Sequence, residues 1–395
     1  MKNQRKERGR PIFNGDLCAQ RMTKTMKHKI SFPHMGKYHI VIGRLLEDLV
    51  GENGEVLTAP AITKRTIELG AKHSPEFVCI PFKYNLGNFI EALDNGANVL
   101  FHTSGDCRMG FYNEVQEQIL RDLGYDFRLC ILETNSRNRS LRDMYKMFKS
   151  LNPQLTWTRL ISSLIFAVRI IFAMDKIEDY VRRNTGFAGD DSLEKIEKRF
   201  LTEVANARGM FHVGRIFRRY MKELRAVPLD KPKNPMKIGI VGELYVLMEP
   251  FSNYFIEKEL AKFGIEVTRF INVSYLLFSP QHKIKHLIKQ AEGYVTYEIG
   301  ADGTDSVAKC VHFARNGYDG IIHLKPFGCT PEVNSIPICQ RVSEDFGIPI
   351  LYFSFDAQTS ETGVKTRLEA FYDMISMKRD AGREMPEIPE IPMRG

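Results

Sequence analysis

The chain has 395 residues, of which 43% are hydrophobic and 26% charged, a composition typical of a soluble globular protein with about two or three domains. The formal net charge is +8, but residues 1–29 hold nine Lys/Arg and two Asp/Glu, so the remaining chain is nearly neutral. This distribution argues against nucleic-acid binding by the body of the protein, although the basic N-terminal extension could touch RNA or anionic surfaces. The longest apolar run, residues 160–174, is too short for a bilayer and contains Arg169, so we expect a buried helix and no membrane contact.

The N-terminus is basic but has no apolar stretch behind it, which predicts no secretory signal and therefore a cytoplasmic location. The seven cysteines include no CxxC pair. In a reducing compartment an odd number of cysteines is not a disulfide framework, so any special cysteine is expected to be a metal ligand or a reactive thiol.

Residues 29–139 alternate short apolar runs with amphipathic runs. The apolar runs are expected to form strands and cover residues 29–32, 55–60, 76–81, 97–103 and 126–132. The amphipathic runs are expected to form helices that end at glycine and cover residues 37–51, 82–96 and 110–124. Strands that alternate with helices predict a parallel sheet covered on both faces.

The rest of the chain divides into a helical part and a second α/β part. Residues 140–226 form a predicted helical module, because Leu193, Ile196, Phe200, Val204 and Ala207 recur at helical spacing. Residues 227–235 contain three prolines and are expected to be a linker. Residues 236–376 return to alternation, with strands expected at 236–243, 265–271, 318–327 and 348–355, and helices at 250–264, 305–317, 333–347 and 361–375. The tails, residues 1–28 and 377–395, are expected to be disordered.

Three cysteines lie where predicted strands end and helices begin. Cys79 lies at the end of the predicted strand at 76–81. Cys107 follows the next predicted strand, and Cys329 follows a predicted strand of the second domain. In open α/β sheets this edge carries the site, and a helix N-terminus favours a thiolate over a thiol. The other candidates, Cys130, Cys310 and Cys339, lie within apolar runs and are expected to be packing residues. Cys79 alone would suit the same interpretation.

A cation accompanies each of the three thiols. Lys83 follows Cys79 by four residues, Arg108 adjoins Cys107, and Lys325 precedes Cys329 by four. Such cations would stabilise an anionic metal cluster, although any one of them alone is more simply a solvated surface charge. Three thiolates suit either an iron–sulfur cluster with one open iron or a zinc ion completed by His102 or His323, and the spacing does not choose between them.

Six motifs in order resemble one family: KISFPHMGKYHI, SPEFVCIPFKYNLGN, GDCRMGFYNEVQEQILRDLGYDF, GELYVLMEPFSN, PFGCTPE and TGVKTRLEAF. The chain is similar, over residues 29–376, to the iron–sulfur components of 2-hydroxyacyl-CoA dehydratases and benzoyl-CoA reductases, in the branch of acyl-CoA dehydratase activase-related proteins. The resemblance implies two Rossmann-like α/β domains joined by the helical module. It also implies a [4Fe-4S] cluster held by Cys79, Cys107 and Cys329.

The resemblance further implies a partner and a reaction. A separate activator ATPase would pass a low-potential electron to the cluster, which in the dehydratases reduces an acyl-CoA thioester to a ketyl radical. The sequence has no phosphate-binding loop of its own, so this chain is not expected to be the activator. Catalytic dehydratases of this family work with a second homologous subunit; nothing in this sequence shows one, and a dimer stays open.

Glu332 and Glu243 are the candidate acid/base groups, since each lies close in sequence to a predicted strand end. Capping of the following helix is the simpler interpretation of Glu332. Two other functions remain open at this point: an electron relay that carries the same cluster without a substrate pocket, and a zinc-binding structural protein.

Overall fold

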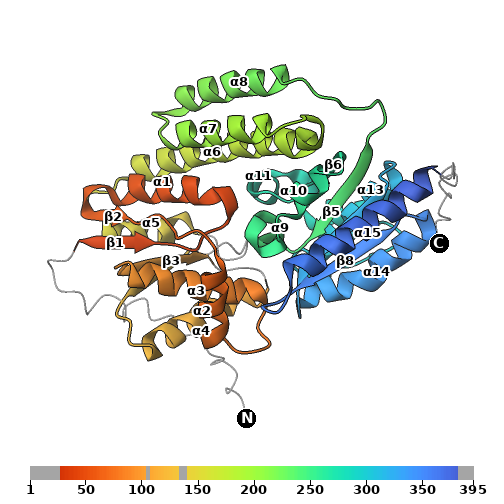
Figure 1. The fold of residues 1–395 in the computed structure, drawn as a ribbon. Coiled ribbons are helices and arrows are strands. Elements are labelled where there is room, and N and C mark those ends of the chain that lie inside the picture. The colour runs from red at the N-terminus through yellow and green to blue at the C-terminus, as the bar shows by residue number, and fades with distance from the viewer. Residues whose placement is uncertain (1–26, 104–106, 133–139, 381–395) are drawn as a thin grey trace, which may run out of the picture.

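The computed structural model describes residues 27–103, 107–132 and 140–380, which form two α/β units and a layer of long helices (Figure 1). The predicted tails lie largely outside these residues. Both sheets have four strands and are parallel throughout, with the orders β2-β1-β3-β4 and β6-β5-β7-β8. The predicted fold class, α/β with two parallel-sheet domains, is therefore confirmed.

In the first sheet, neighbouring strands pair in parallel register. Strand β3 pairs with β4 from Val99 opposite Arg128 to Thr103 opposite Leu132. Its strands are β1 (His28–Ser31), β2 (Gly54–Val56), β3 (Val99–Thr103) and β4 (Arg128–Leu132). The connecting helices are η2 (Gly36–Tyr38), α1 (His39–Val50), η3 (Gly51–Asn53), α2 (Lys64–His73), α3 (Ile80–Asp94) and α4 (Met109–Asp122).

The second sheet repeats this arrangement. Its strands are β5 (Met236–Gly242), β6 (Ile265–Arg269), β7 (Gly320–Pro326) and β8 (Ile350–Phe355). Strand β7 is buried along its whole length, as expected for a central parallel strand. The helices are α9 (Leu244–Met248), η5 (Pro250–Asn253), α10 (Ile256–Ala261), α11 (Val273–Phe278), η6 (Pro280–His282), α12 (Ile284–Gln290), α13 (Gly303–Arg315), α14 (Thr330–Phe346) and α15 (Glu361–Asp380).

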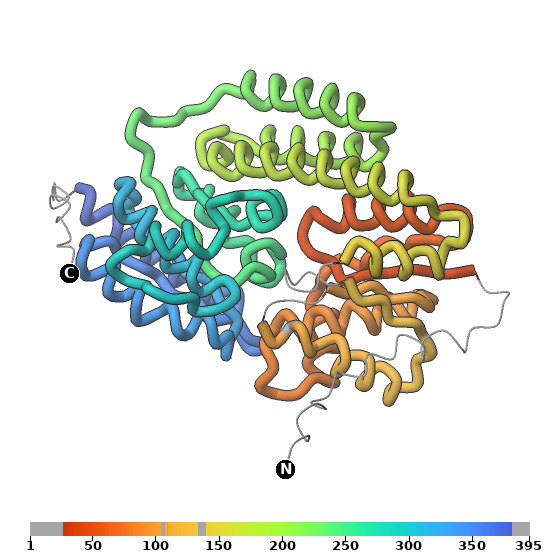
Figure 2. The backbone as a smooth tube through the Cα atoms, turned by 180° about the vertical axis from the view of Figure 1, so that it is seen from behind, coloured from red at the N-terminus to blue at the C-terminus, as the bar shows by residue number. Residues whose placement is uncertain are grey.

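The helical segment between the sheets contains α5 (Leu141–Leu151), α6 (Trp157–Asn184), η4 (Thr185–Phe187), α7 (Ser192–Ala205) and α8 (Met210–Ala226). The apolar residues of α7 that set the predicted periodicity are buried, and α8 buries a matching face. The run at residues 160–174 lies within α6, a partly buried helix rather than a membrane span. Figure 2 shows α6, α7 and α8 stacked beside both α/β units from the opposite side.

Several sequence predictions differ from the structure. The strand predicted at 55–60 ends at Val56, and the helix predicted at 250–264 is divided into η5 and α10 by positive φ angles at Tyr254 and Phe255. Residues 76–81 are not a strand: Glu76–Cys79 are loop, and α3 begins at Ile80 with Pro81 in its first turn. Proline is favoured there because the first N–H groups of a helix need no partner within the helix. Helices α2, α11 and α12 were not predicted, and each has ten residues or fewer.

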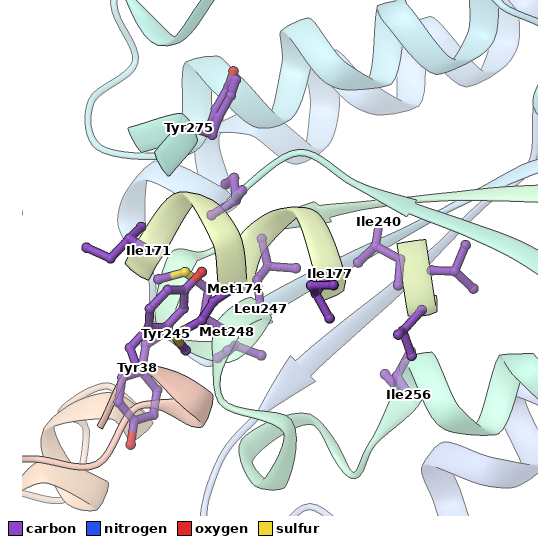
Figure 3. Packing of buried hydrophobic residues seen from close by; sticks show 14 of the residues in the cluster. Tyr38, Ile171, Met174, Ile177, Ile240, Tyr245, Leu247, Met248, Ile256 and Tyr275 are labelled. Carbon is purple, nitrogen blue, oxygen red and sulfur yellow. The ribbon is translucent and has the colours of Figure 1, made fainter. Parts of the chain in front are cut away.

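The two α/β units share one apolar core with α6. Tyr38 and Tyr84 of the first unit join Tyr245 and Met248 of the second in a single buried cluster. Figure 3 shows Tyr38, Tyr245 and Met248 in this cluster. Gly36 has a φ of +48°, and a Cβ on it would lie 2.3 Å from the Met248 carbonyl oxygen, so only glycine allows this approach. This shared core packs the two α/β units against each other and against α6.

A buried carboxylate reinforces the same junction. Oε2 of Glu249 accepts a hydrogen bond of 2.6 Å from the Gly36 N–H and lies 2.9 Å from His34 Nδ1. Glu249 is 3% exposed, so these partners compensate for most of its desolvation. The junction is therefore specified by polar contacts as well as by apolar packing.

Candidate iron–sulfur site

The three candidate cysteines lie at the starts of three helices. Cys79 precedes α3 directly, Cys329 precedes α14 directly, and Cys107 lies two residues before α4. Cys79 and Cys329 share a local pattern, because each is an extended N-cap residue followed by a proline in the first helical turn. The first turns of α3 and α14 therefore bring backbone N–H groups close to the two sulfur atoms.

The thiols are close enough to affect one another. The negative charges of Glu243 and Cys107 help to raise the pKa of Cys79, and the charges of Glu243 and Cys79 help to raise that of Cys329. Cys79 and Cys107 belong to the first α/β unit, whereas Cys329 and Glu243 belong to the second. Charged groups of each unit thus affect the pKa of a thiol in the other unit, although burial is the larger cause for both thiols.

Direct hydrogen bonds connect the loops around these cysteines. Cys79 Sγ lies 2.9 Å from the hydroxyl of Tyr112, which is on α4. The Arg108 guanidinium donates a 3.1 Å hydrogen bond to Thr330 Oγ1, the residue after Cys329. The Cys107 loop therefore contacts the first turn of α14 across the boundary between the units.

Burial outweighs the helix N-termini in setting the thiol pKa values. Burial is the largest cause that raises the pKa of Cys79 to about 11, and hydrogen bonds from Tyr112 and the Phe82 backbone only partly oppose it. Burial likewise raises the pKa of Cys329. For Cys79 and Cys329 the predicted preference for the thiolate is therefore outweighed, because burial disfavours the charged thiolate more than the helix N-termini favour it.

The donor set fits an iron–sulfur cluster in its chemistry. The three thiols lie at three helix starts, and backbone N–H groups of Phe82 and Glu332 stabilise charge on Cys79 and Cys329. N–H groups near cysteine sulfur are the usual environment of such clusters. Within residues 27–103, 107–132 and 140–380, no three His, Cys, Asp or Glu side chains already stand together as a metal site. The ligand type thus suits a cluster, and the described residues show no preassembled site.

The three accompanying cations have different environments. Lys83 is buried and its ammonium donates a 3.0 Å hydrogen bond to the Glu76 carbonyl oxygen. Lys325 is also buried; burial lowers its pKa, and the charges of Cys329 and Glu332 partly restore it. Arg108 is exposed apart from its bond to Thr330. Lys325 and Arg108 lie beside Cys329, and only Arg108 among the three is a surface charge.

Glu243 forms the carboxylate side of this region. It caps α9 by accepting a 3.0 Å hydrogen bond from the Val246 N–H, and its own N–H donates to the Leu324 carbonyl at the end of β7. Gly242 permits this turn, since a Cβ there would lie 1.8 Å from the same Leu324 oxygen. Burial raises the pKa of Glu243 to about 7, with the charge of Glu332 adding to the effect.

Asp302 is a second carboxyl group here that the sequence interpretation missed. It accepts a 3.0 Å hydrogen bond from the Leu244 N–H, next to Glu243. Burial raises its pKa well above the usual range, and the Glu243 charge adds to this. In the sequence, its position between Gly300 and Gly303, just before α13, could have indicated a carboxyl group at a loop near the site. Glu243 and Asp302 therefore form a pair that cannot ionise independently.

Glu332 is not positioned as a helix cap or as an exposed acid/base group. The N-cap of α14 is Cys329, and no side chain caps that helix. The Glu332 carboxylate is fully buried and lies 2.7 Å from His323 Nε2 and 2.9 Å from Ser306 Oγ. The capping interpretation is therefore wrong, and Glu332 has a structural network of its own.

The two histidines considered for zinc differ in their partners. His102 is buried, with Nδ1 2.7 Å from the Thr103 carbonyl oxygen and Nε2 3.3 Å from Asn85 Nδ2. Burial lowers its pKa to about 4, so it is neutral and both nitrogens have partners. His323 is completely buried with Nε2 against Glu332, whereas its Nδ1 has no partner among the described residues. The contacts of His102 therefore argue against zinc binding there, and those of His323 do not choose between zinc and a cluster.

Comparison with known families agrees with the second half of this site. A family model described as 2-hydroxyglutaryl-CoA dehydratase, D-component, matches residues 254–375. This segment carries the signature of that dehydratase component family. The chain has no significant match among curated proteins.

The matched segment confirms the family resemblance that the sequence motifs predicted. It includes β6, β7, β8, Cys329, Asp302 and Glu332, whereas Cys79, Cys107 and Glu243 lie N-terminal to it. The dehydratase component family is thus matched around one of the three candidate ligands. Cys79 and Cys107 lie outside the match and stay predicted ligands.

The remaining described cysteines are packing residues. Cys310 and Cys339 lie fully buried in one apolar cluster of the second unit, and Cys130 lies in the core beside β1 and β3. Their predicted role is confirmed.

In the described part of the chain no helix is both long and apolar enough to span a membrane.

Proposed function

We propose that this chain is an iron–sulfur component of an acyl-CoA dehydratase or reductase system, with a [4Fe-4S] cluster held by Cys79, Cys107 and Cys329. The observation that carries the proposal is the contact between the Cys107 and Cys329 loops, where Arg108 bonds to Thr330, beside a segment that matches a dehydratase component. When bound, the cluster supplies one-electron transfer at low potential.

The protein side chains tune the charge and protons of this region. Lys325 and Arg108 place positive charge beside Cys329, which favours an anionic group there. Glu243, with a pKa of about 7, can hold a proton at neutral pH and release it to a neighbouring group. Glu332 is enclosed by His323 and Ser306, so we assign it a supporting role instead of contact with substrate.

A separate ATPase is the proposed electron source. Three strongly exposed phenylalanines flank the three cysteines: Phe77 is 79% exposed, Phe111 71% and Phe327 54%. Phe77 and Phe327 come from different units and line one small pocket of about 180 Å³ together with Lys83. Exposed aromatic side chains grouped in this way are typical of a protein interface.

The proposal is tested by reduction under oxygen-free conditions. Together with an activator ATPase, ATP and an electron donor, the protein should be reduced and should convert a 2-hydroxyacyl-CoA. Reduction without conversion of any acyl-CoA in a panel would favour the electron-relay alternative. Equal reduction by a mild donor without the ATPase would contradict the partner assignment.

Replacing Arg108 with glutamine is expected to leave the cluster assembled but harder to reduce, lowering its potential by roughly tens of millivolts. The change removes a positive charge whose guanidinium reaches Thr330, beside Cys329. Redox titration followed by electron paramagnetic resonance measures the shift. The control, Thr330→Val, removes the hydrogen bond but keeps the charge, so it should shift the potential less. An unchanged potential in R108Q would make Arg108 an ordinary surface residue.

Glu243 is expected to make metal-free protein less stable as the pH rises. Because the folded pKa of about 7 exceeds the ordinary 4.5, folding favours the protonated form. This contribution is fully present below the unfolded pKa and is lost as the pH rises through the folded pKa. Between about pH 5 and about pH 8, the unfolding free energy should fall by about 2 kcal/mol more in wild type than in Glu243→Gln. Denaturant unfolding at both pH values measures this, and parallel losses would contradict the assigned pKa.

A further inference from the structure

A groove separate from the cysteines lies where α6, α8 and the start of α11 meet. Its volume is about 970 Å³, within the range of small-molecule sites. Figure 2 shows α8 in light green beside α6, with the teal α11 segment on the other side of α6. No step of the proposed dehydratase chemistry uses this groove.

Five cations line the groove from two helices, and one of them, Arg183 of α6, pairs with Asp179. Lys176 comes from α6, and Arg218, Lys222 and Arg225 come from α8. The three α8 residues are spaced by four and three positions, which places them on one helix face. In the described ranges of the chain, Lys176, Lys222 and Arg225 have no carboxylate partner within ion-pair distance. Like charges gathered on one face repel one another, so an anion bound there would relieve that repulsion.

The two carboxylates of the groove do not neutralise these cations. Asp175 is 4% exposed and accepts hydrogen bonds from the Tyr38 hydroxyl at 2.6 Å and from the Ser274 N–H at 2.8 Å. Asp179 pairs with Arg182 at 2.7 Å and with Arg183 at 3.1 Å. The positive charge of Lys176 and the α8 residues therefore remains available to a ligand.

An apolar, aromatic end adjoins the cationic part. Phe172 lines the groove and also an adjoining pocket of about 350 Å³, which it shares with Phe270 and Phe278. The rings of Phe172 and Phe278 lie 5.4 Å apart between centroids, and both are partly exposed. A planar base could stack here while its phosphates reach the cations.

We propose that this groove binds a nucleotide with an aromatic base and at least two phosphates. The ligand could be a free nucleoside diphosphate or the nucleotide end of a coenzyme A thioester, since both present the same chemistry. The coenzyme A assignment rests on the proposed acyl-CoA role, whereas the free-nucleotide assignment goes beyond it, and neither depends on a cluster being bound.

The test is calorimetric titration of the full-length protein with ADP, coenzyme A, adenosine and pyrophosphate. We expect ADP or coenzyme A to bind at least about tenfold more tightly than adenosine, because adenosine lacks the phosphates. The double variant K222Q/R225Q should weaken that binding by about tenfold or more. The control K198Q/R208Q removes two exposed positive charges elsewhere on the helical layer, and should change the affinity by less than about twofold. Phe172→Ala should weaken ADP more than pyrophosphate.

The outcomes separate the two sources and can overturn the site. Tighter binding of ADP assigns a free nucleotide, and tighter binding of coenzyme A assigns its nucleotide end. Absence of binding by both, or binding that K222Q/R225Q does not weaken, overturns the proposal. Equal weakening in K198Q/R208Q would also overturn it, because it would show only a general charge effect.

Discussion

Single replacement of Cys79, Cys107 or Cys329 by alanine is expected to remove most of the iron from the anaerobically purified protein. A cubane cluster normally takes four cysteines, so two remaining thiolates would hold it poorly. The three residues come from two units that meet at one region, so they should behave as one set. Iron and sulfide analysis of the three variants beside wild type measures the loss.

The matched controls are Cys310→Ala and Cys339→Ala. Both residues are fully buried in the second unit and should cost only packing, on the order of 1 kcal/mol, with iron content unchanged. Thermal unfolding of all five variants separates ligand loss from loss of the fold. Equal iron loss at all five positions would mean that unfolding, and not ligand removal, explains the result.

Replacement of Glu332 by alanine is expected to destabilise the metal-free protein by about 3 kcal/mol. The change leaves His323 and Ser306 without the carboxylate that they contact in a completely buried site. Denaturant unfolding at neutral pH gives the free-energy difference. Using metal-free protein keeps cluster binding out of the measurement.

Glu344→Ala on the same helix is the control for this change. Its side chain is 71% exposed and its nearest cation, Arg341, is 4.0 Å away, so the cost should stay below about 0.5 kcal/mol. If Glu332→Ala lowers the unfolding free energy as little as Glu344→Ala does, the buried network contributes little to stability. Glu332 would then have to be reconsidered as a group that acts at the site.

The sequence predicted the sheets well, because their strands are continuous apolar runs. Residues 236–243 and 318–327 are examples, and they became the central strands β5 and β7. The same criterion failed at residues 76–81, where an apolar run is a loop and a helix start. Apolar character alone does not separate these cases, whereas Pro81 marks the first helical turn.

The sequence shows which cysteines precede helices but not what contacts them. A cysteine before a helix is visible in the sequence, as at Cys107 and Cys329. The bond between Arg108 and Thr330 joins residues 222 positions apart, and no local pattern shows it. The thiol pKa values were also beyond the sequence, because they depend on how deeply the two units bury Cys79 and Cys329 when they pack together.

The most direct test of the central claim is one analysis of the wild-type protein, purified without oxygen. The proposed site predicts a brown protein with about four iron and four sulfide per chain, and a cluster signal in electron paramagnetic resonance after reduction. A colourless protein without iron or sulfide, or one that holds zinc instead, would contradict the assignment of Cys79, Cys107 and Cys329 as cluster ligands.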